Sequence, residues 1–121
     1  MVGVDISGRH EEAEGYLMVA AAVHARIDSS RIRSIEGVGL AAAREGPTLE
    51  ATLEVTAEAI GNLPEPPTCP IVAEGGEFYE EPADRVELSF QPEFKYVESI
   101  AERETVQAAH HAAYAARSLL L

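Results

Sequence analysis

An aspartate in the middle of a short apolar run is the first residue of this sequence that needs a chemical explanation. Asp5 lies inside the segment VGVDI, residues 2–6, whose apolar character predicts a strand buried on both faces. A carboxylate without partners is costly in a low-dielectric interior, so it must become neutral or find a cation. Asp5 therefore predicts either a metal ligand or a carboxylate held by hydrogen bonds to the Ser7-Gly8 turn.

A second carboxylate, Glu74, directly follows the apolar segment IVA of residues 71–73 and precedes Gly75 and Gly76. Glycines allow a ligand to approach the backbone closely. Magnesium and manganese prefer oxygen ligands, and two such ions about 4 Å apart can activate water during phosphodiester cleavage. We therefore expect Asp5 and Glu74 to lie on adjacent, parallel strands, with side chains that converge on a Mg²⁺ or Mn²⁺ site.

Other reactive side chains give weaker signals. His110 and His111 are neighbours, and on a helix their side chains point about 100° apart, so they cannot both bind one ion unaided. His24 and His10 are expected to pack or to face solvent, although His10 is close in sequence to Asp5. The single Cys69 has no helix start nearby to lower its pKa, and it is not expected to be a nucleophile.

The first part of the chain predicts three strands joined as a meander. Residues 2–6 form the first, the long apolar run of residues 15–25 forms the second, and residues 31–40 form the third after a turn at residues 28–30. Apolar residues at helical spacing then predict a helix from Pro47 to Gly61. Its acids Glu50, Glu54 and Glu58 lie on one stripe, which a solvated face would explain equally well.

The second part of the chain predicts two more strands and a long helix. Four prolines make residues 63–70 a rigid connection, after which residues 71–73 form a strand and the alternating segment RVELSF, residues 85–90, forms a fifth strand. Residues 97–121 form a final helix with a face of alanines. This order predicts one α/β domain over residues 1–121, a five-stranded mixed sheet with two main helices on its faces.

Composition limits the classes of function. The chain has 121 residues, and its 21 acidic against 9 basic residues give a formal net charge of -12, a field that repels nucleic acid unless divalent metals neutralise the carboxylates. No segment approaches the roughly 18 uninterrupted apolar residues of a membrane span. The start lacks a secretory pattern and Cys69 has no disulfide partner, so we expect a cytoplasmic protein.

The opening VGVDISGR, followed by GYLMVAAAV, resembles the amino-terminal strand pair of type 2 ribonucleases H, in which G-x-D-E-x-G-R precedes an apolar strand. It also resembles the first strand of Holliday junction resolvases of the same fold. Ile6 stands where the type 2 pattern has its glutamate. The whole chain is similar to small uncharacterised archaeal proteins assigned to this superfamily. The resemblance implies a ribonuclease H-like fold, with active-site acids on the first strand, the first helix, the end of the fourth strand and near the final helix.

Carried over by position, the resemblance implies a site made of Asp5, Glu50, Glu74, and Glu98 or Glu102. Such a site implies a metal-dependent nuclease or phosphodiesterase that uses Mg²⁺ or Mn²⁺ on a nucleic acid. The alternative is a non-catalytic protein of the same fold that serves as a scaffold or a protein-interaction module. The net charge and the missing glutamate at Ile6 favour that alternative.

The end of the final helix also bears on assembly. The helix carries a row of alanines, and the chain closes with Leu119 to Leu121. Three terminal leucines must be covered, either by the core of their own domain or by a second copy across a two-fold axis. We expect a homodimer.

Overall fold

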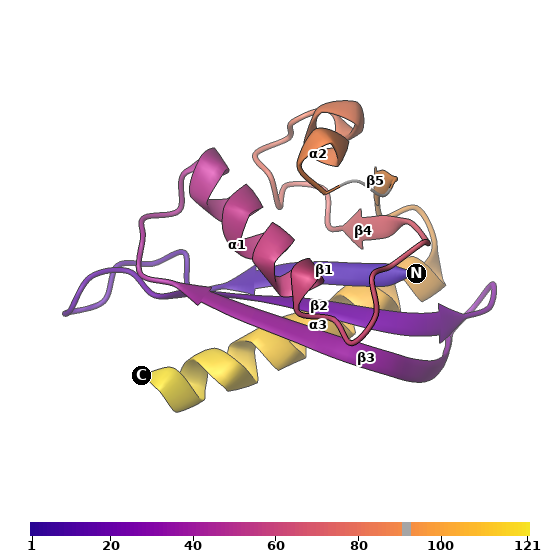
Figure 1. The fold of residues 1–121 in the computed structure, drawn as a ribbon, viewed down its shortest axis with the longest axis horizontal. Helices are drawn as coiled ribbons and strands as arrows, with labels where there is room; N and C mark the ends of the chain where they lie inside the picture. The colour runs from indigo at the N-terminus through magenta and orange to yellow at the C-terminus, as the bar shows by residue number, and fades with distance from the viewer. Residues whose placement is uncertain (91–92) are drawn as a thin grey trace.

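The computed structural model describes residues 1–90 and 93–121. Within these residues the chain forms one five-stranded mixed sheet with helices on both of its faces (Figure 1). The elements in chain order are β1 (Val2–Ser7), β2 (Met18–Ile27), β3 (Ile32–Ala43), α1 (Leu49–Gly61), β4 (Ile71–Ala73), α2 (Ala83–Phe90), β5 (Phe94–Tyr96) and α3 (Ile100–Leu120).

The sheet has the strand order β3-β2-β1-β4-β5. The first three strands form the expected antiparallel meander, whereas β4 runs parallel to both β1 and β5. The predictions of an α/β fold and a five-stranded mixed sheet are therefore confirmed. β1 lies in the centre of the sheet, and α1 and α3 cover its two faces (Figure 1).

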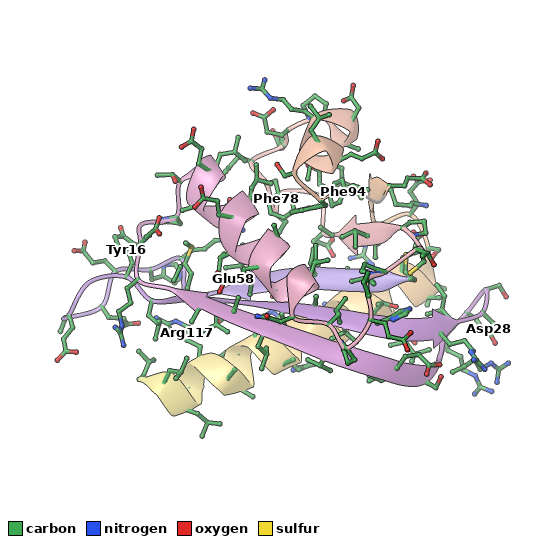
Figure 2. The ribbon with its side chains drawn as sticks, in the orientation of Figure 1. Tyr16, Asp28, Glu58, Phe78, Phe94 and Arg117 are labelled. Atoms are coloured by element: carbon green, nitrogen blue, oxygen red, sulfur yellow. The ribbon has the colours of Figure 1, made fainter. Side chains whose placement is uncertain are left out.

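The face under α1 is an apolar core. Val2, Val4 and Ile6 of β1 belong to it, together with the buried residues of α1. The ring of Phe78 packs edge-on against Phe90 and Phe94, with centroids 5.6 and 5.9 Å apart. Figure 2 shows Phe78 and Phe94 on this side of the sheet, near α2 and β4. This cluster anchors the segment that follows β4.

The face under α3 is made of small residues. A Cβ on Gly3 would lie 2.6 Å from the backbone carbonyl of Thr105, so only glycine at this position lets α3 approach β1 so closely. Beside it, Ala21 and Val23 of β2 pack against alanines of α3. The helix starts at a capping box formed by Ser99 and Glu102.

The fifth strand and the number of helices were predicted wrongly. Residues 85–90 belong to the helix α2, and the fifth strand is Phe94–Tyr96, so the described chain has three helices rather than two. Val86 and Phe90 are buried while Leu88 is 74% exposed, which is the four-residue spacing of a helix and not the alternation of a strand. None of these helices is long and apolar enough to cross a membrane.

Candidate functional site

The register of the parallel strands brings two of the predicted acids together. Val2 pairs with Ile71 and Gly3 with Val72, so continuing the ladder places Asp5 beside Glu74. Asp5 shares a face of β1 with Gly3, and its carboxylate contacts α3. The predicted adjacent, parallel strands are confirmed as β1 and β4, with Asp5 inside β1 and Glu74 directly after β4.

The closest acidic partner of Asp5 is Glu77, in the segment that follows β4. Its side chain is only 7% exposed, and the carboxyl groups of Glu77 and Asp5 share a hydrogen bond. Burial, reinforced by the hydrogen bond and the charge of Asp5, raises the pKa of Glu77 to about 8. Burial also raises the pKa of Asp5. The pair therefore holds a proton on Glu77 at neutral pH.

Arg9 supplies the positive charge nearest to this carboxyl pair. Its guanidinium donates to the Glu77 carboxylate, to the Glu77 backbone oxygen at 2.6 Å, and to the Tyr79 hydroxyl at 3.0 Å. The Tyr79 hydroxyl donates in turn to the carbonyl of Pro47. Arg9 thus ties together the loops that follow β1, follow β4 and precede α1. The charge of Arg9 lowers the pKa of Glu77, but burial and the neighbouring Asp5 outweigh it.

His110 reaches the same pair from α3. Its Nδ1 lies 3.0 Å from an Oδ of Asp5, while the ring is about half exposed. The ring of His111 lies beside it, with the centroids 5.6 Å apart. Ala109 and Ala113 face the sheet. His110, which follows Ala109, therefore lies at the side of the helix, next to β1. The sequence analysis compared the two histidines only with each other and missed this position.

Glu74 lies at the rim of the cluster. Its carboxylate is 2.9 Å from the guanidinium of Arg103 on α3, and its negative charge contributes to the raised pKa of Asp5. The side chain is 45% exposed. Glu74 is therefore near Asp5 electrostatically but is held by its own basic partner.

The structure does not bring the remaining predicted acids to Asp5. Glu50 begins α1, on the opposite face of the sheet from α3 (Figure 1), and it lines a shallow surface pocket with Leu53 and Glu54. Glu102 accepts hydrogen bonds from the backbone at the start of α3 and pairs with Lys95 at 2.8 Å. The exposed Glu98 lies 3.7 Å from the same lysine.

The other candidates from the sequence have different surroundings. Gly8 adopts a φ of 100°, and a Cβ there would lie 2.0 Å from the Leu17 carbonyl oxygen, so the turn after β1 is closed by protein. The Nε2 of His24 lies 3.7 Å from the Sγ of Cys69 at the other end of the sheet. His10 is exposed.

The site consists of two carboxyl groups in contact, an imidazole, a third carboxylate at the rim and two guanidinium groups. Its oxygen ligands are of the kind that Mg²⁺ and Mn²⁺ prefer. In the part of the chain that is described, however, no three His, Cys, Asp or Glu side chains are arranged so that they could hold one ion. The basic side chains hold the acids in this conformation. Glu77 and Arg9 were missed from the sequence, although Arg9 lies inside the quoted VGVDISGR segment.

The chain is similar to a protein family and to a known archaeal protein. Residues 2–121 match the family described as an uncharacterized protein conserved in archaea, DUF2209. The chain is also similar to the uncharacterized protein MJ0095 of Methanocaldococcus jannaschii, with 28% identity over 121 residues that cover 99% of this chain and 95% of that protein. Both matches extend over the whole domain, so the elements that carry Asp5, Glu77 and His110 all lie within the matched region.

Proposed function

This chain belongs to the archaeal family DUF2209, and we propose that it is a metal-dependent nuclease or phosphodiesterase with a ribonuclease H-like fold. The metal is Mg²⁺ or Mn²⁺, and the substrate is a nucleic acid phosphodiester. The fold assignment is supported by the strand and helix order and by the positions of Asp5 on the first strand and Glu74 after the fourth.

One observation carries the proposal: the buried carboxyl pair of Asp5 and Glu77 at the carboxyl ends of two parallel strands. A raised pKa of about 8 at Glu77 means that a second negative charge there is not compensated by the protein. Groups with strongly perturbed pKa values gather at functional sites. If the pair had only a structural role, two apolar residues of similar size would give the folded chain equal or greater stability.

The donor chemistry of the pair fits a divalent cation. Once a cation displaces the proton of Glu77, the pair carries two negative charges against the one positive charge of Arg9, and Glu74 adds a further acid already paired with Arg103. Asp5 and Glu77 would hold the ion, which when bound supplies an activated water for attack on phosphorus. His110 contacts Asp5 and can exchange a proton at its solvent-facing side.

The alternative of a non-catalytic scaffold is supported by one specific feature. Each acid of the cluster already has a basic partner: Arg9 for Glu77, Arg103 for Glu74 and His110 for Asp5. In that case the cluster would hold three loops and α3 together, and added metal would change neither the stability nor the activity of the chain. The experiment below separates the two functions.

The test is cleavage of labelled RNA, DNA, RNA–DNA hybrid and branched DNA by the full chain, with Mg²⁺, Mn²⁺ or a chelator. The variants are Asp5→Asn and Glu77→Gln, and the matched control is Glu50→Gln, an acid on the other face of the sheet. We expect metal-dependent cleavage that falls by at least about 100-fold in the first two variants, as for loss of a metal ligand or catalytic group.

Glu50→Gln is expected to retain its activity. If Asp5→Asn and Glu50→Gln reduced cleavage equally, the pair of Asp5 and Glu77 would not be part of the active site. A chain that cleaves none of these substrates with either metal would contradict the nuclease proposal and leave the scaffold as the function.

A further inference from the structure

The outer strand of the sheet, β3, has a free edge. It is 12 residues long and is the first strand in the order β3-β2-β1-β4-β5. Within residues 1–90 and 93–121 no strand pairs with its outer side. Every second backbone N–H and C=O group of such a strand points outward, and a long open edge is a template for another strand.

An apolar row runs along this edge. Ile35, Val38 and Leu40 are 55%, 43% and 41% exposed. They are registered with Ala25, Val23 and Ala21 of β2, and the last two of these pack against α3. The row therefore lies on the same face of the sheet as α3. Because α3 packs mainly on β1 and β2, the helix leaves the row on β3 uncovered.

The second half of this edge carries few of the features that prevent pairing, whereas the first half has Arg33, Glu36 and two bulges. Residues 37–43, GVGLAAA, contain no charge and no proline, the two devices that most often protect an edge. In this half the exposed Asn62 donates a hydrogen bond to the carbonyl of Leu40 at 2.8 Å, and at the start of the strand Glu104 accepts one from the Ile32 N–H at 3.3 Å. A side-chain amide held by one bond at the surface can be displaced by a strand.

We propose that β3 pairs antiparallel with β3 of a second copy, which forms a two-fold dimer with one continuous sheet. The two-fold axis is perpendicular to the sheet, so both copies present α3 on the same face. The two rows of Ile35, Val38 and Leu40 then meet between the two α3 helices and are removed from water.

The apolar row of β3 is complementary to itself. In antiparallel pairing centred on Val38 that passes over the bulge at Glu36, as the β2–β3 register does, Val38 lies opposite Val38 and Ile35 lies opposite Leu40 of the other copy. At longer range two chains of net charge -12 repel each other. The dimer should therefore become tighter as salt is added, because salt screens the repulsion more than it weakens an apolar interface.

The experiment is sedimentation equilibrium of the full chain at micromolar concentrations. We expect a dimer, and the variant carrying Val38→Lys and Leu40→Lys should weaken it by at least about 100-fold, because the first substitution places two like charges opposite each other at the axis and the second places a charge in the apolar interface. The control is Leu88→Lys, on a more exposed apolar residue of α2, which should leave the dimer unchanged. All three side chains are exposed, so circular dichroism should show a normal fold.

A second variant tests the position of the axis. Residues directly opposite each other on antiparallel strands have Cα atoms about 5 Å apart, within the range of a disulfide. In a Cys69→Ser background, Val38→Cys should oxidise to a covalent dimer and Leu88→Cys should not. A monomeric natural chain, or a dimer insensitive to the β3 lysines, would overturn the proposal. So would a dimer lost only when Leu119 to Leu121 are removed, since the interface would then lie at the end of α3.

Discussion

The two faces of β1 are built from different residues and meet different demands. Toward α1, Val2, Val4 and Ile6 join an apolar core that contains the aromatic cluster around Phe78. Toward α3, the same strand presents Gly3, which admits the helix, and Asp5, which meets Glu77 and His110. One face of the strand holds the fold together, whereas the other face holds charged groups in place.

This difference teaches how a small domain can support a costly carboxyl pair. The segment after β4 carries Glu77 toward Asp5 and, one residue later, Phe78 into the apolar core. Adjacent residues of this segment therefore serve opposite faces. Packing of Phe78 limits the movement of Glu77, and such support by rigid neighbours is what gives a site its precision.

The largest expected effect comes from emptying the apolar face. Phe78 is fully buried, and Phe78→Ala should lower the free energy of unfolding by about 3–5 kcal/mol. Urea denaturation followed by circular dichroism measures the change. Leu88→Ala, at a residue that is 74% exposed, should change it by less than about 0.5 kcal/mol. If the two variants were equally stable, the aromatic cluster would not be the core described above.

Crowding the other face should have the next largest effect. Gly3→Ala places a Cβ 2.6 Å from the Thr105 carbonyl group, and we expect a loss of about 1–3 kcal/mol because α3 must move away. Gly61→Ala is the matched control, since no atom lies within 4 Å of the added carbon. A Gly3 variant as stable as the Gly61 variant would mean that α3 does not pack closely on β1.

The carboxyl pair should make stability depend on pH. The pKa of Glu77 is raised from 4.5 to about 8 in the folded chain, so the folded state keeps a proton that the unfolded state releases. The contribution of Glu77 to stability is therefore fully present below about pH 4.5 and falls as pH rises toward 8, by on the order of 1 kcal/mol per pH unit.

Glu77→Gln should flatten this decline, because the amide has no proton to lose. Denaturation curves between pH 5 and 8 compare the two chains. Asp28 and Glu102, whose pKa values are lowered, act only at more acidic pH and do not disturb this window. An equally steep decline in the glutamine variant would show that another group titrates.

The smallest effect on stability is expected at the partly exposed His110. His110→Ala removes a contact with Asp5 that solvent screens, so the loss should stay below about 1 kcal/mol. If the nuclease proposal is correct, cleavage should nevertheless fall by about 10- to 100-fold, because the imidazole no longer orients Asp5 or exchanges its proton. His111→Ala should leave both quantities unchanged. Equal losses in the two variants would remove the special role of His110.

The meander, α1, β4 and α3 could be predicted because their periodicity and their end signals agree. The helix α2 was mistaken for a strand because Val86, Leu88 and Phe90 alternate, and the sequence does not show that only the first and last are buried. A segment of six residues, such as residues 85–90, fits the period of a helix and the period of a strand equally well. The strand Phe94–Tyr96 is too short to show any period.

The site was predicted only in part. Asp5 and Glu74 stood out because acids at buried strands are unusual. Glu77 lies in a loop whose path depends on the burial of Phe78. The position of His110 depends on the rotation of α3, which is determined by packing against Gly3 of β1 and against Ala21 and Val23 of β2. The resemblance placed the remaining acids by order along the chain, and order does not determine the face on which a side chain lies.

The central claim is that the buried pair of Asp5 and Glu77 binds a divalent cation. The most direct test is the unfolding temperature of the full chain at neutral pH with millimolar Mg²⁺ or Mn²⁺, compared with Asp5→Asn and with Glu50→Gln. An ion that binds only the folded state stabilises it by mass action, so the natural chain and Glu50→Gln should both unfold at higher temperature with metal, while Asp5→Asn should not respond. No shift in the natural chain, or an equal shift in Asp5→Asn, would contradict the account.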